Sequence, residues 1–600
     1  MEIKNDIRNR INLLREQMKE YQLAAFIVPS TDPHSGEYVP AHWESRKWIT
    51  GFTGSAGTAV ITQEKAGLWT DSRYFIQAEE QLAGTDIQLF KEKLPDTPSI
   101  TEWLGNTLEI GDKVGIDGWV NSHSEAQSLH YELQEKGLEL VTMTEDIFNT
   151  IWKNRPHLPQ SPIFIFDIER TGQSCSEKIK QIQNAISANG ASSIILTALD
   201  EIAWTLNLRG EDVHCNPVFI SYLLISESSH TLYILEDKIS EQVLDYLKRN
   251  QIHIRPYTAL AEDLYTFNNQ PQGKLQISPL ANEALYNLAI KNTDTIIAPS
   301  PVALMKAIKN PIEQSGFRKA MELDGVAMVK FLHWLKTSAK IEEESELSID
   351  RKLYECRAEQ PGFKGISFDT IAGYKEHAAI VHYESTPETD IPLAPKGLLL
   401  LDSGAQYLDG TTDITRTIVL GPLTEEEKRD YTLVLKGHLQ LQNAHFPAGT
   451  CGTQLDVLAR MAMWKAGINY LHGTGHGIGH FLSVHEGPHQ IRMNYMPTPL
   501  QPGMIVTNEP GIYKAGRHGI RIENTLLIVP CQETEFGSFY KFEPLTLCPI
   551  DKEGIIVELL NEEELTWLNE YHQMVYDRLS PLLEYSEQTW LKEATKPIKR

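Results

Sequence analysis

The first part of the chain alternates between apolar runs and segments with helical spacing. Residues 5–21 predict a helix, with apolar side chains at Ile7, Ile11, Leu14, Met18 and Tyr21. Apolar runs at 24–30, 57–62 and 66–71 predict buried strands, and a second helix begins within 72–82. Strands and helices that follow one another in this way are typical of an α/β domain.

The same order of elements recurs further along the chain. A helix over 176–190 ends in Asn-Gly, an apolar run follows from residue 192, and two more apolar runs cover 219–226 and 230–237. Each segment corresponds in order to one of the first set, which predicts a tandem duplication of one α/β domain. Two copies are too few for a solenoid, so two similar domains are the simpler interpretation.

Proline-containing segments that are poor in apolar residues mark the joins, at 154–162 and near 306–314. Beyond them a long helix begins at Glu313, and its core-facing candidates are Phe317, Met321, Met328, Phe331 and Leu335. A strand-rich domain with interspersed helices follows. Its aromatic helical tail, 562–584, offers apolar surface to pack on the domain or on a second subunit. We therefore predict two similar α/β domains, 1–157 and 158–309, followed by an α+β domain, 310–600.

Composition narrows the possible functions. At 600 residues the chain is too long for one core, and its 41% hydrophobic and 22% charged residues are ordinary for a globular protein. The net charge of −25 argues against nucleic acid or an anionic membrane as a partner. Six scattered cysteines without CxxC spacing argue against a disulfide framework or a thiolate metal site. The start lacks an apolar signal region and no run of eighteen apolar residues follows, so we expect a cytoplasmic location.

Candidate chemistry is concentrated in the last domain. Four carboxylates and one imidazole lie on predicted strands or strand edges: Asp402, Asp413, His476, Glu509 and Glu523. Hard oxygen ligands with a single nitrogen suit a pair of Mn²⁺, Co²⁺ or Zn²⁺ ions bridged by carboxylates. Asp402 closes the apolar run 397–402, where an uncompensated carboxylate would be costly. These residues predict a two-metal hydrolase.

The relation between the two aspartates stays open at this level. A hairpin turn at Asp409-Gly410 would place Gln406 opposite Asp413. Asp402 would then lie about four residue pairs from Asp413, roughly 13 Å at the rise of a strand. A bulge or a longer loop would have to close that gap. The alternative is an ordinary hairpin with one turn aspartate and one surface aspartate.

Histidines and glycines alternate in the segment 471–480. The glycines defeat a regular helix, so His472 and His476 do not form a helical pair, and we expect the glycines to let the backbone pass close to metal or substrate. No GxGxxG register fits the segment. The letters HEGPH at 485–489 match HExxH, but Gly487-Pro488 breaks the helix that the zinc-protease motif needs. His485 remains a candidate hydrogen-bond donor. His382 ends a further predicted strand, where a core histidine is as good an interpretation as a functional one.

Taken in order, these motifs resemble the pita-bread metallopeptidases, and within them the long, three-domain aminopeptidase P (Xaa-Pro aminopeptidase) branch. The resemblance depends on DSGAQYLDGTTDITRT, LHGTGHGIG, VHEGP, NEPG and GIRIEN, and extends to WTDSRYFIQA in the first domain and FEPLTLCPI near the end. It therefore covers nearly the whole chain, and it implies a C-terminal pita-bread domain.

The resemblance implies a role for each candidate residue. Two divalent metal ions per subunit, Mn²⁺ first with Co²⁺ or Zn²⁺ as alternatives, would be held by Asp402, Asp413, His476, Glu509 and Glu523, with Asp413 and Glu523 bridging. Glu509 would also move a proton from the attacking water to the proline nitrogen. The histidines of the catalytic and substrate-binding site would be His382, His472 and His485. Arg521 would orient ligands, and Arg73 would reach the peptide from the first domain.

The activity implied is removal of the N-terminal residue from peptides with proline in the second position, by attack of a metal-bridging hydroxide on the Xaa-Pro bond. Two alternatives are a prolidase restricted to Xaa-Pro dipeptides and an inactive peptide-binding module. The two additional domains and Arg73 favour longer peptides, and the unsubstituted ligand positions argue against the inactive module. The family also implies a homodimer through the last domain, with peptides as partners and neither nucleic acid nor membrane.

Overall fold

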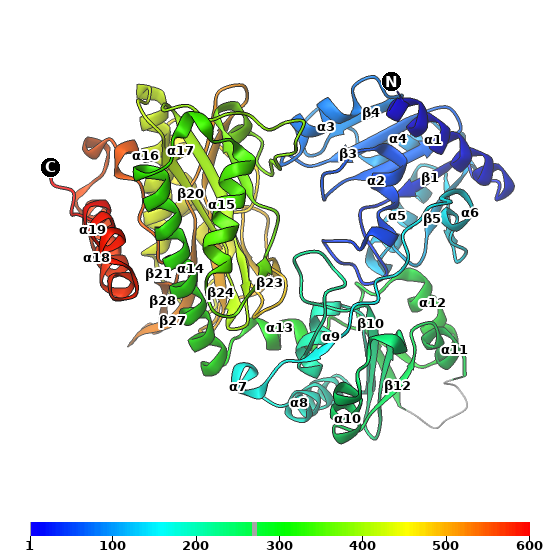
Figure 1. The fold of residues 1–600 in the computed structure, drawn as a ribbon. Helices are drawn as coiled ribbons and strands as arrows, with labels where there is room; N and C mark the ends of the chain where they lie inside the picture. Colours follow the sequence, from blue (N-terminus) through cyan, green and yellow to red (C-terminus); the bar gives the residue numbers. More distant parts are fainter. Residues whose placement is uncertain (1, 267–272) are drawn as a thin grey trace. The chain divides into compact units, whose positions relative to one another are not determined.

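The computed structural model describes residues 2–266 and 273–600, and these form two compact units. Unit 1 comprises Met1–Ile168 and Gln173–Val302, and unit 2 comprises Glu169–Gly172 and Ala303–Arg600. Figure 1 shows the elements of both units in chain order. Each unit is described by itself below.

Unit 1 contains two six-stranded sheets with the same strand order. The first runs β4-β3-β2-β1-β5-β6 and the second β12-β11-β10-β8-β13-β14. In the first sheet β1 pairs antiparallel with β2 and parallel with β5. In the second, β8 pairs antiparallel with β10 and parallel with β13. Both sheets thus have one topology, and the expectation of two similar α/β domains is confirmed.

The strands of these sheets are β1 (Ala25–Val28), β2 (Thr58–Thr62), β3 (Ala66–Thr70), β4 (Ile87–Lys91), β5 (Lys113–Asp117), β6 (Glu139–Met143), β8 (Ala191–Leu196), β10 (Ser221–Ser226), β11 (His230–Ile234), β12 (Ile252–Pro256), β13 (Lys274–Ile277) and β14 (Thr295–Ile297). A small pair, β7 (Phe164–Ile165) and β9 (Leu208–Arg209), lies outside them. The helices of unit 1 are α1 (Glu2–Glu20), α2 (Ser45–Thr50), α3 (Phe75–Leu82), α4 (Ile100–Gly105), α5 (His123–Glu135), α6 (Phe148–Ile151), α8 (Cys175–Ala188), α9 (Leu199–Leu206), α10 (Glu241–Arg249), α11 (Ala259–Thr266) and α12 (Glu283–Asn292). Helix α7 (Ile168–Thr171) falls in unit 2 from Glu169 on.

Helix α1 shows how the sequence pattern translates into packing. Ile7, Ile11, Leu14 and Met18 are at most 4% exposed and join the core of the first α/β domain, as predicted. Tyr21, the last apolar residue of the predicted helix, is 40% exposed. The reason is that the helix ends at Glu20, and the periodicity does not continue through the turn that follows.

The two α/β domains of unit 1 meet through equivalent helix starts. Ser122 caps α5, Asn282 caps α12, and these two residues form a β-bridge. The His123 N–H donates to the Ala281 carbonyl, and the Glu283 N–H donates to the Asn121 carbonyl. Each domain therefore offers the other the same edge, an arrangement typical of a duplicated unit that packs on its own copy.

Unit 2 places four helices along antiparallel strands (Figure 1). The helices are α14 (Pro311–Thr337), α15 (Glu346–Ala358), α16 (Glu425–Gln442) and α17 (Gly452–Lys465), preceded by α13 (Pro301–Ala307) and followed by α18 (Glu562–Leu579) and α19 (Tyr585–Ala594). All five predicted core positions of α14 are buried: Phe317, Met321, Met328, Phe331 and Leu335. The long central helix is therefore confirmed.

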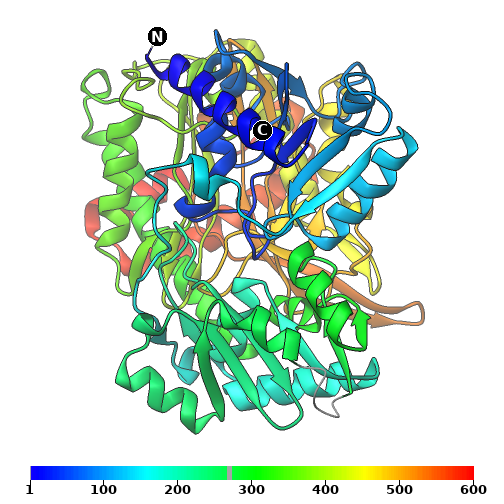
Figure 2. The same ribbon diagram turned by 90° about the vertical axis from the view of Figure 1, so that its right-hand side faces the viewer.

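The strands of unit 2 form four sheets, ordered β15-β18-β19, β16-β17-β20, β21-β28-β27-β24-β22-β23 and β25-β26. Their bounds are β15 (Phe363–Ile366), β16 (Ile371–Tyr374), β17 (Leu398–Ser403), β18 (Ala405–Tyr407), β19 (Gly410–Thr411), β20 (Ile414–Val419), β21 (His445–Pro447), β22 (Gly475–Gly477), β23 (Glu486–Ile491), β24 (Ile505–Asn508), β25 (Gly511–Lys514), β26 (His518–Arg521), β27 (Asn524–Thr534) and β28 (Gly537–Pro544). The β27–β28 hairpin is drawn in orange in Figure 2.

The aromatic tail packs on its own unit. Leu568 and Val575 of α18 and Leu591 of α19 are fully buried in a cluster that includes Leu398 of strand β17. Two packing partners were predicted for the tail, its own domain or a second subunit, and the tail packs on its own domain. Across the described residues, the structure contains no helix with both the length and the apolar character needed to cross a membrane.

A capping residue at the start of α14 allows a test of this fold. Asn310 Oδ1 accepts from the Ile312 and Glu313 N–H groups at 2.9 and 3.1 Å. Asn310→Ala leaves both donors without this acceptor, so we expect unit 2 to lose about 1 kcal/mol of stability. The measurement is the urea midpoint of the full chain by circular dichroism. Asn310→Asp retains the acceptor but, like Asn310→Ala, loses the bond from Asn310 Nδ2 to the Thr171 carbonyl, so it should be more stable than Asn310→Ala and the difference between the two measures the cap. If both variants lose the same stability, the cap is not the cause.

Candidate metal centre

Asp402 and Asp413 are brought together by strands β17 and β20. Asp402 lies opposite Thr415, only two residues past Asp413. The residues between the two strands form a separate hairpin, in which Gln406 pairs with Thr411 and Tyr407 with Gly410. The predicted register, with Gln406 opposite Asp413, is therefore wrong, and no gap of four residue pairs exists.

Gly404 explains this change of register. It lies where the chain passes from β17 to β18, and a Cβ there would come within 2.1 Å of Ser367 Oγ and the Thr412 carbonyl oxygen. The Thr412 N–H also donates to the Ala405 carbonyl at 2.8 Å. A residue without a side chain lets the chain leave one sheet and enter another at this point. Asp413 is thereby held at the start of β20, beside Asp402.

His476 lies on β22 with a defined ring orientation. Its Nδ1 is 2.9 Å from the Gly477 carbonyl oxygen. Because a carbonyl only accepts, Nδ1 carries the proton and Nε2 of the neutral ring is left with a lone pair. That Nε2 is 3.4 Å from Asp413 Oδ2 and 3.5 Å from Glu509 Oε1. Ligand atoms of Asp413, His476 and Glu523 all lie within 4.8 Å of one another.

The glycines around His476 have a structural explanation. A Cβ at Gly475 would lie 1.9 Å from the Thr507 carbonyl oxygen of β24, and one at Gly477 would lie 2.3 Å from the Glu486 carbonyl oxygen of β23. The expectation that these glycines make room for metal or substrate is therefore replaced. They make room for the backbones of the two neighbouring strands, which pack against β22 on either side.

Two of the carboxylates each have one buried oxygen that accepts no hydrogen bond from the described residues. Asp402 Oδ2 accepts from Arg521, and Glu523 Oε2 accepts from Thr415 Oγ1 at 2.7 Å. Within the part of the chain that is described, Asp402 Oδ1 and Glu523 Oε1 receive no hydrogen bond. A buried carboxylate oxygen without a donor is costly unless a cation compensates it. This donor set of hard oxygens and one imidazole fits divalent metal ions.

Electrostatics support the same interpretation. Burial, followed by the charge of its carboxylate neighbours, raises the pKa of Glu523 well above its ordinary value. Burial likewise raises the pKa of Glu509 to about 7. Burial alone would lower the pKa of His476, but Asp413 and Glu509 raise it to about 9. Without a cation, the cluster would hold protons at neutral pH, and a metal ion has to displace them.

A chain of hydrogen bonds runs from the carboxylates to His472. Arg521 Nη2 donates to Asp402 Oδ2 at 2.6 Å, and its Nη1 donates to Tyr513 Oη at 2.7 Å. His472 Nδ1 donates to the Gly473 carbonyl at 2.7 Å, so Tyr513 Oη donates to His472 Nε2 at 2.8 Å. Sequence reasoning missed Tyr513. Its position on β25, two residues after the NEPG motif, was the available signal.

The loop before β22 is fixed by helix α17. Arg460 Nη1 donates to the Tyr470 carbonyl at 2.5 Å and Nη2 to the His472 carbonyl at 2.9 Å. Asp456 on the same helix accepts from Arg460 Nε and from Thr474 Oγ1. Sequence reasoning also missed this buried pair, because helical spacing of opposite charges is more often a feature of exposed faces.

The other candidate histidines also lie in unit 2. The ring of His485 is 4.3 Å from that of His476, nearly perpendicular to it. His382 follows a 3-10 helix, Lys375–Ala379, so the strand predicted to end at His382 is wrong. Pairing with β17 ends at Tyr374, and the chain then turns away over β26. Arg521 Nη2 donates to the Val381 carbonyl at 3.3 Å, which ties this turn to the carboxylates.

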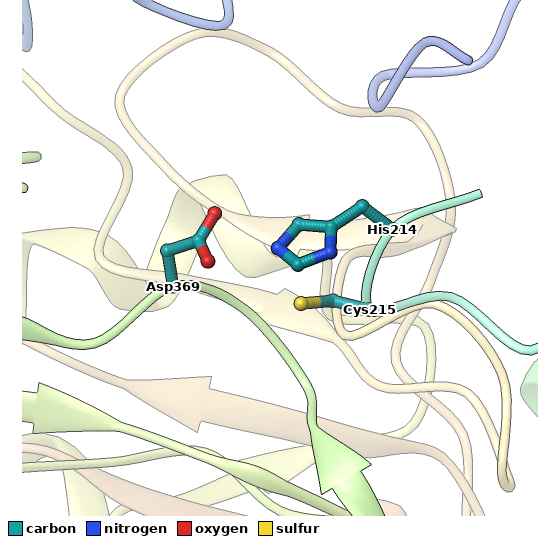
Figure 3. A group of neighbouring side chains, drawn as sticks. All are labelled: His214, Cys215 and Asp369. Atoms are coloured by element: carbon teal, nitrogen blue, oxygen red, sulfur yellow. The ribbon is translucent and has the colours of Figure 1, made fainter. Parts of the chain in front are cut away.

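Arg73 and one group of three residues are the remaining candidates. Arg73 belongs to unit 1, where its guanidinium forms a bidentate pair with Asp71 at 2.9 and 2.7 Å. Figure 3 shows His214, Cys215 and Asp369, which have metal-ligating chemistry. His214 and Asp369 are exposed and belong to different units, so we assign this group to no site.

The segment HEGPH is confirmed as unrelated to a helical zinc motif. Residues Glu486–Ile491 form strand β23, so His485 and His489 do not share a helical face. His489 is buried, and its Nε2 donates to the Ile505 carbonyl at 2.7 Å, which makes it a core histidine.

Comparisons with known proteins identify the family of the chain. The profile of metallopeptidase family M24 matches residues 315–530, and that of the C-terminal region of the family matches 538–598. Profiles of the creatinase/prolidase N-terminal domain match 10–150 and 154–313. The second of these extends across the second α/β sheet, which supports the same fold class.

Similarity extends over almost the full length of individual relatives. The chain is 41% identical to the probable Xaa-Pro aminopeptidase P of Laccaria bicolor, covering 98% of this chain and 93% of that protein. It is 39% identical to Xaa-Pro aminopeptidase 1 of Dictyostelium discoideum, covering 99% and 97%. The structure of X-prolyl aminopeptidase from Caenorhabditis elegans, described as a cytosolic enzyme with a di-nuclear active site, superposes with a TM-score of 0.94 at 33% identity, covering 99% and 100%. The chain therefore belongs to metallopeptidase family M24, in the form that carries two creatinase/prolidase N-terminal domains.

Proposed function

We propose that this protein is a metal-dependent aminopeptidase that removes the N-terminal residue from peptides with proline in the second position. The observation that carries the proposal is the cluster of Asp413, His476 and Glu523, together with Asp402 Oδ1 and Glu523 Oε1, buried oxygens that receive no hydrogen bond from the described residues. Relatives that match nearly the whole chain at 36–41% identity are named aminopeptidase P or Xaa-Pro aminopeptidase. The activity follows from that cluster and that family together.

The proposed metal ligands are Asp402, Asp413, His476, Glu509 and Glu523. They would hold two divalent ions, with Mn²⁺ as the first choice and Co²⁺ or Zn²⁺ as alternatives, because carboxylate oxygens and one imidazole suit all three. When bound, such ions polarise a carbonyl group and make water a stronger nucleophile at neutral pH. Arg521 holds Asp402 in place through Oδ2, which leaves Oδ1 directed to a ligand.

The protein's own groups would then move protons and orient the peptide. Glu509 is half-buried, its Oε1 3.5 Å from His476 Nε2, and we assign it the transfer of a proton from the attacking water to the proline nitrogen. That transfer matters because the leaving nitrogen of an Xaa-Pro bond carries no N–H. His382 and His485 are assigned as donors to the carbonyl oxygen, and His472, held by Tyr513, as a further contact of the substrate.

The wider assignments are also proposals. Arg73 would contact longer peptides from unit 1, and we retain the domain boundaries 1–157, 158–309 and 310–600. A homodimer through unit 2 is favoured by the exposed apolar side chains Met461 and Trp464, three residues apart on α17. A cytoplasmic location is favoured by the structural relative that is described as cytosolic. Peptides, rather than nucleic acid or membrane, are the proposed partners.

The activity is tested with two tripeptides. Metal-stripped protein that is given Mn²⁺ should release arginine from Arg-Pro-Pro and not from Arg-Ala-Ala, measured by chromatography of the free amino acid. The control is the same protein without added metal. Cleavage of both peptides would remove the proline specificity. Cleavage of Gly-Pro alone would favour a prolidase, and metal binding without any cleavage would favour the inactive peptide-binding module.

The ligand assignment is tested at His476. Replacing it with alanine removes the one nitrogen donor while leaving the acidic groups, so His476→Ala should lose metal and activity together. We expect a loss above about a hundredfold, more than is typical for a residue that only supports a ligand. Metal content by mass spectrometry and kcat are the measurements. His489→Ala is the control, since that histidine bonds to a core carbonyl. Full metal content in His476→Ala would contradict the assignment.

Metal affinity should rise with pH. The pKa of His476 lies near 9 and that of Glu509 near 7 in the metal-free centre, so at pH 6 both groups hold protons. A metal ion must displace these protons, and each one released lowers affinity by about tenfold for each unit of falling pH. Titration calorimetry with Mn²⁺ in buffers of different ionisation enthalpy, between pH 6 and 8, measures the number released. A pH-independent affinity would show that these groups are not ligands.

A further inference from the structure

Glu486, the acidic residue of the HEGPH segment, is a buried residue with two cationic partners. Its side chain is 1% exposed, and those of Lys306 and Lys309 are 3% and 1% exposed. Lys309 Nζ donates to Glu486 Oε1, and Lys306 Nζ lies 3.0 Å from Glu486 Oε2. Each oxygen of the carboxylate therefore faces its own ammonium group. Such an arrangement is rare for lysine, which is seldom fully buried unless it is paired.

The backbone of Glu486 is fitted closely to the strand that carries His476. Glu486 lies opposite Gly477 in the pairing of β23 with β22. A Cβ at Gly479 would come within 3.2 Å of Glu486 Oε2, and one at Gly477 within 2.3 Å of the Glu486 carbonyl oxygen. Two glycines of the motif thus leave space for this one residue. The pairing is irregular here, because Gly477 pairs with Glu486 while His476 pairs with Gln490, so Glu486 holds the start of β23 against β22.

The two lysines are themselves held in place. The Lys309 N–H donates to the Gly503 carbonyl at 2.9 Å, and Ile308 forms a β-bridge with Met504. Lys309 Nζ also donates to the Lys306 carbonyl at 2.7 Å. The segment 306–309 is therefore attached to the start of β24, the strand that leads to Glu509. Through Glu486 the same segment is attached to the start of β23.

The residue before Glu486 is His485, whose ring lies 4.3 Å from that of His476. We propose that Glu486, held by Lys306 and Lys309, is a positioning residue that fixes His485 against His476 for catalysis. This rests on the proposed peptidase function. Glu486 pairs with two ammonium groups, although among the described residues only its Oε1 receives a hydrogen bond, so a shift of β23 would leave a buried charge unpaired, which is strongly unfavourable. The triad therefore fixes the start of β23, and with it the position of His485, rather than adding stability.

Lys309→Met is the first test, because Glu486 retains Lys306. We expect both metal ions to remain bound, KM to change little, and kcat to fall by about tenfold to a hundredfold, the effect of a displacement of roughly 1 Å at a reacting group. The matched control is Lys436→Met. Lys436 also pairs with a buried glutamate, Glu564, which keeps donors from Gln440 and from the Asn561 N–H.

A double-mutant cycle separates positioning from general damage. If Lys309 acts through His485, the loss of kcat on Lys309→Met should disappear when His485 is already alanine. Equal losses in both backgrounds, or no loss of kcat in the single variant, would overturn the proposal. If Lys309→Met does not fold, Lys306→Met allows the same comparison, since Lys309 then remains with Glu486.

A second measurement does not depend on activity. Hydrogen–deuterium exchange of the full chain should become faster in peptides covering 475–491 in the Lys309→Met variant and stay unchanged in Lys436→Met. If wild type cleaves no Xaa-Pro peptide, the proposed function fails, and this exchange alone decides whether the triad anchors β23. Unchanged exchange over 475–491 would overturn the anchor itself.

Discussion

The structure of unit 2 depends on the concentration of negative charge in its interior. Four carboxylates lie close enough to influence one another's pKa. Two of them, Asp402 and Glu523, each have one buried oxygen that receives no hydrogen bond from the described residues. Like charges in a low-dielectric interior repel strongly, so the folded chain has to hold them rigidly and supply cations. Divalent metal ions would supply positive charge at the centre. Around the centre, buried arginine and lysine side chains supply it.

Arg416 shows how far this support extends. It is 2% exposed, and its guanidinium donates to the Thr415 and Glu523 carbonyls, to Cys548 and to Tyr571 of α18. The Arg416 side chain thus joins strand β20 to helix α18. The packing of α18 against the core is consequently part of the site's architecture, although none of its residues is a candidate ligand. Removal of the tail would expose the Arg416 charge and loosen β20, which carries Thr415.

Much of the fold and part of the candidate site could be predicted from the sequence. The remaining features were missed for physical reasons. The core of α14, the duplicated α/β domains and the strand ends at Asp402 and Glu509 follow from apolar periodicity, which is a local signal. The position of Asp413 does not, because Gly404 moves the chain between sheets and so changes the register. The turn before His382 escaped prediction because its apolar residues, Ala378 to Val381, are buried as a strand's would be, although they lie at the end of the 3-10 helix Lys375–Ala379 and in the turn after it. Arg460 was missed because opposite charges at helical spacing are more often found on exposed faces. Tyr513 was missed because its contacts with Arg521 and His472 follow from how the strands pack and not from a local pattern.

In the motif HGTGHG the same local hydrogen-bond arrangement occurs twice. His472 donates Nδ1–H to the carbonyl of Gly473, and His476 donates Nδ1–H to the carbonyl of Gly477. In each case the residue after the histidine supplies the acceptor, which fixes the tautomer and leaves Nε2 as the outward nitrogen. For His476 this nitrogen faces the carboxylates, and for His472 it faces Tyr513. A Cβ at Gly477 would also meet the backbone of β23, so the second glycine supplies the acceptor while allowing the neighbouring strand to approach. Strand β23 therefore packs against β22 at the same glycine whose carbonyl orients His476.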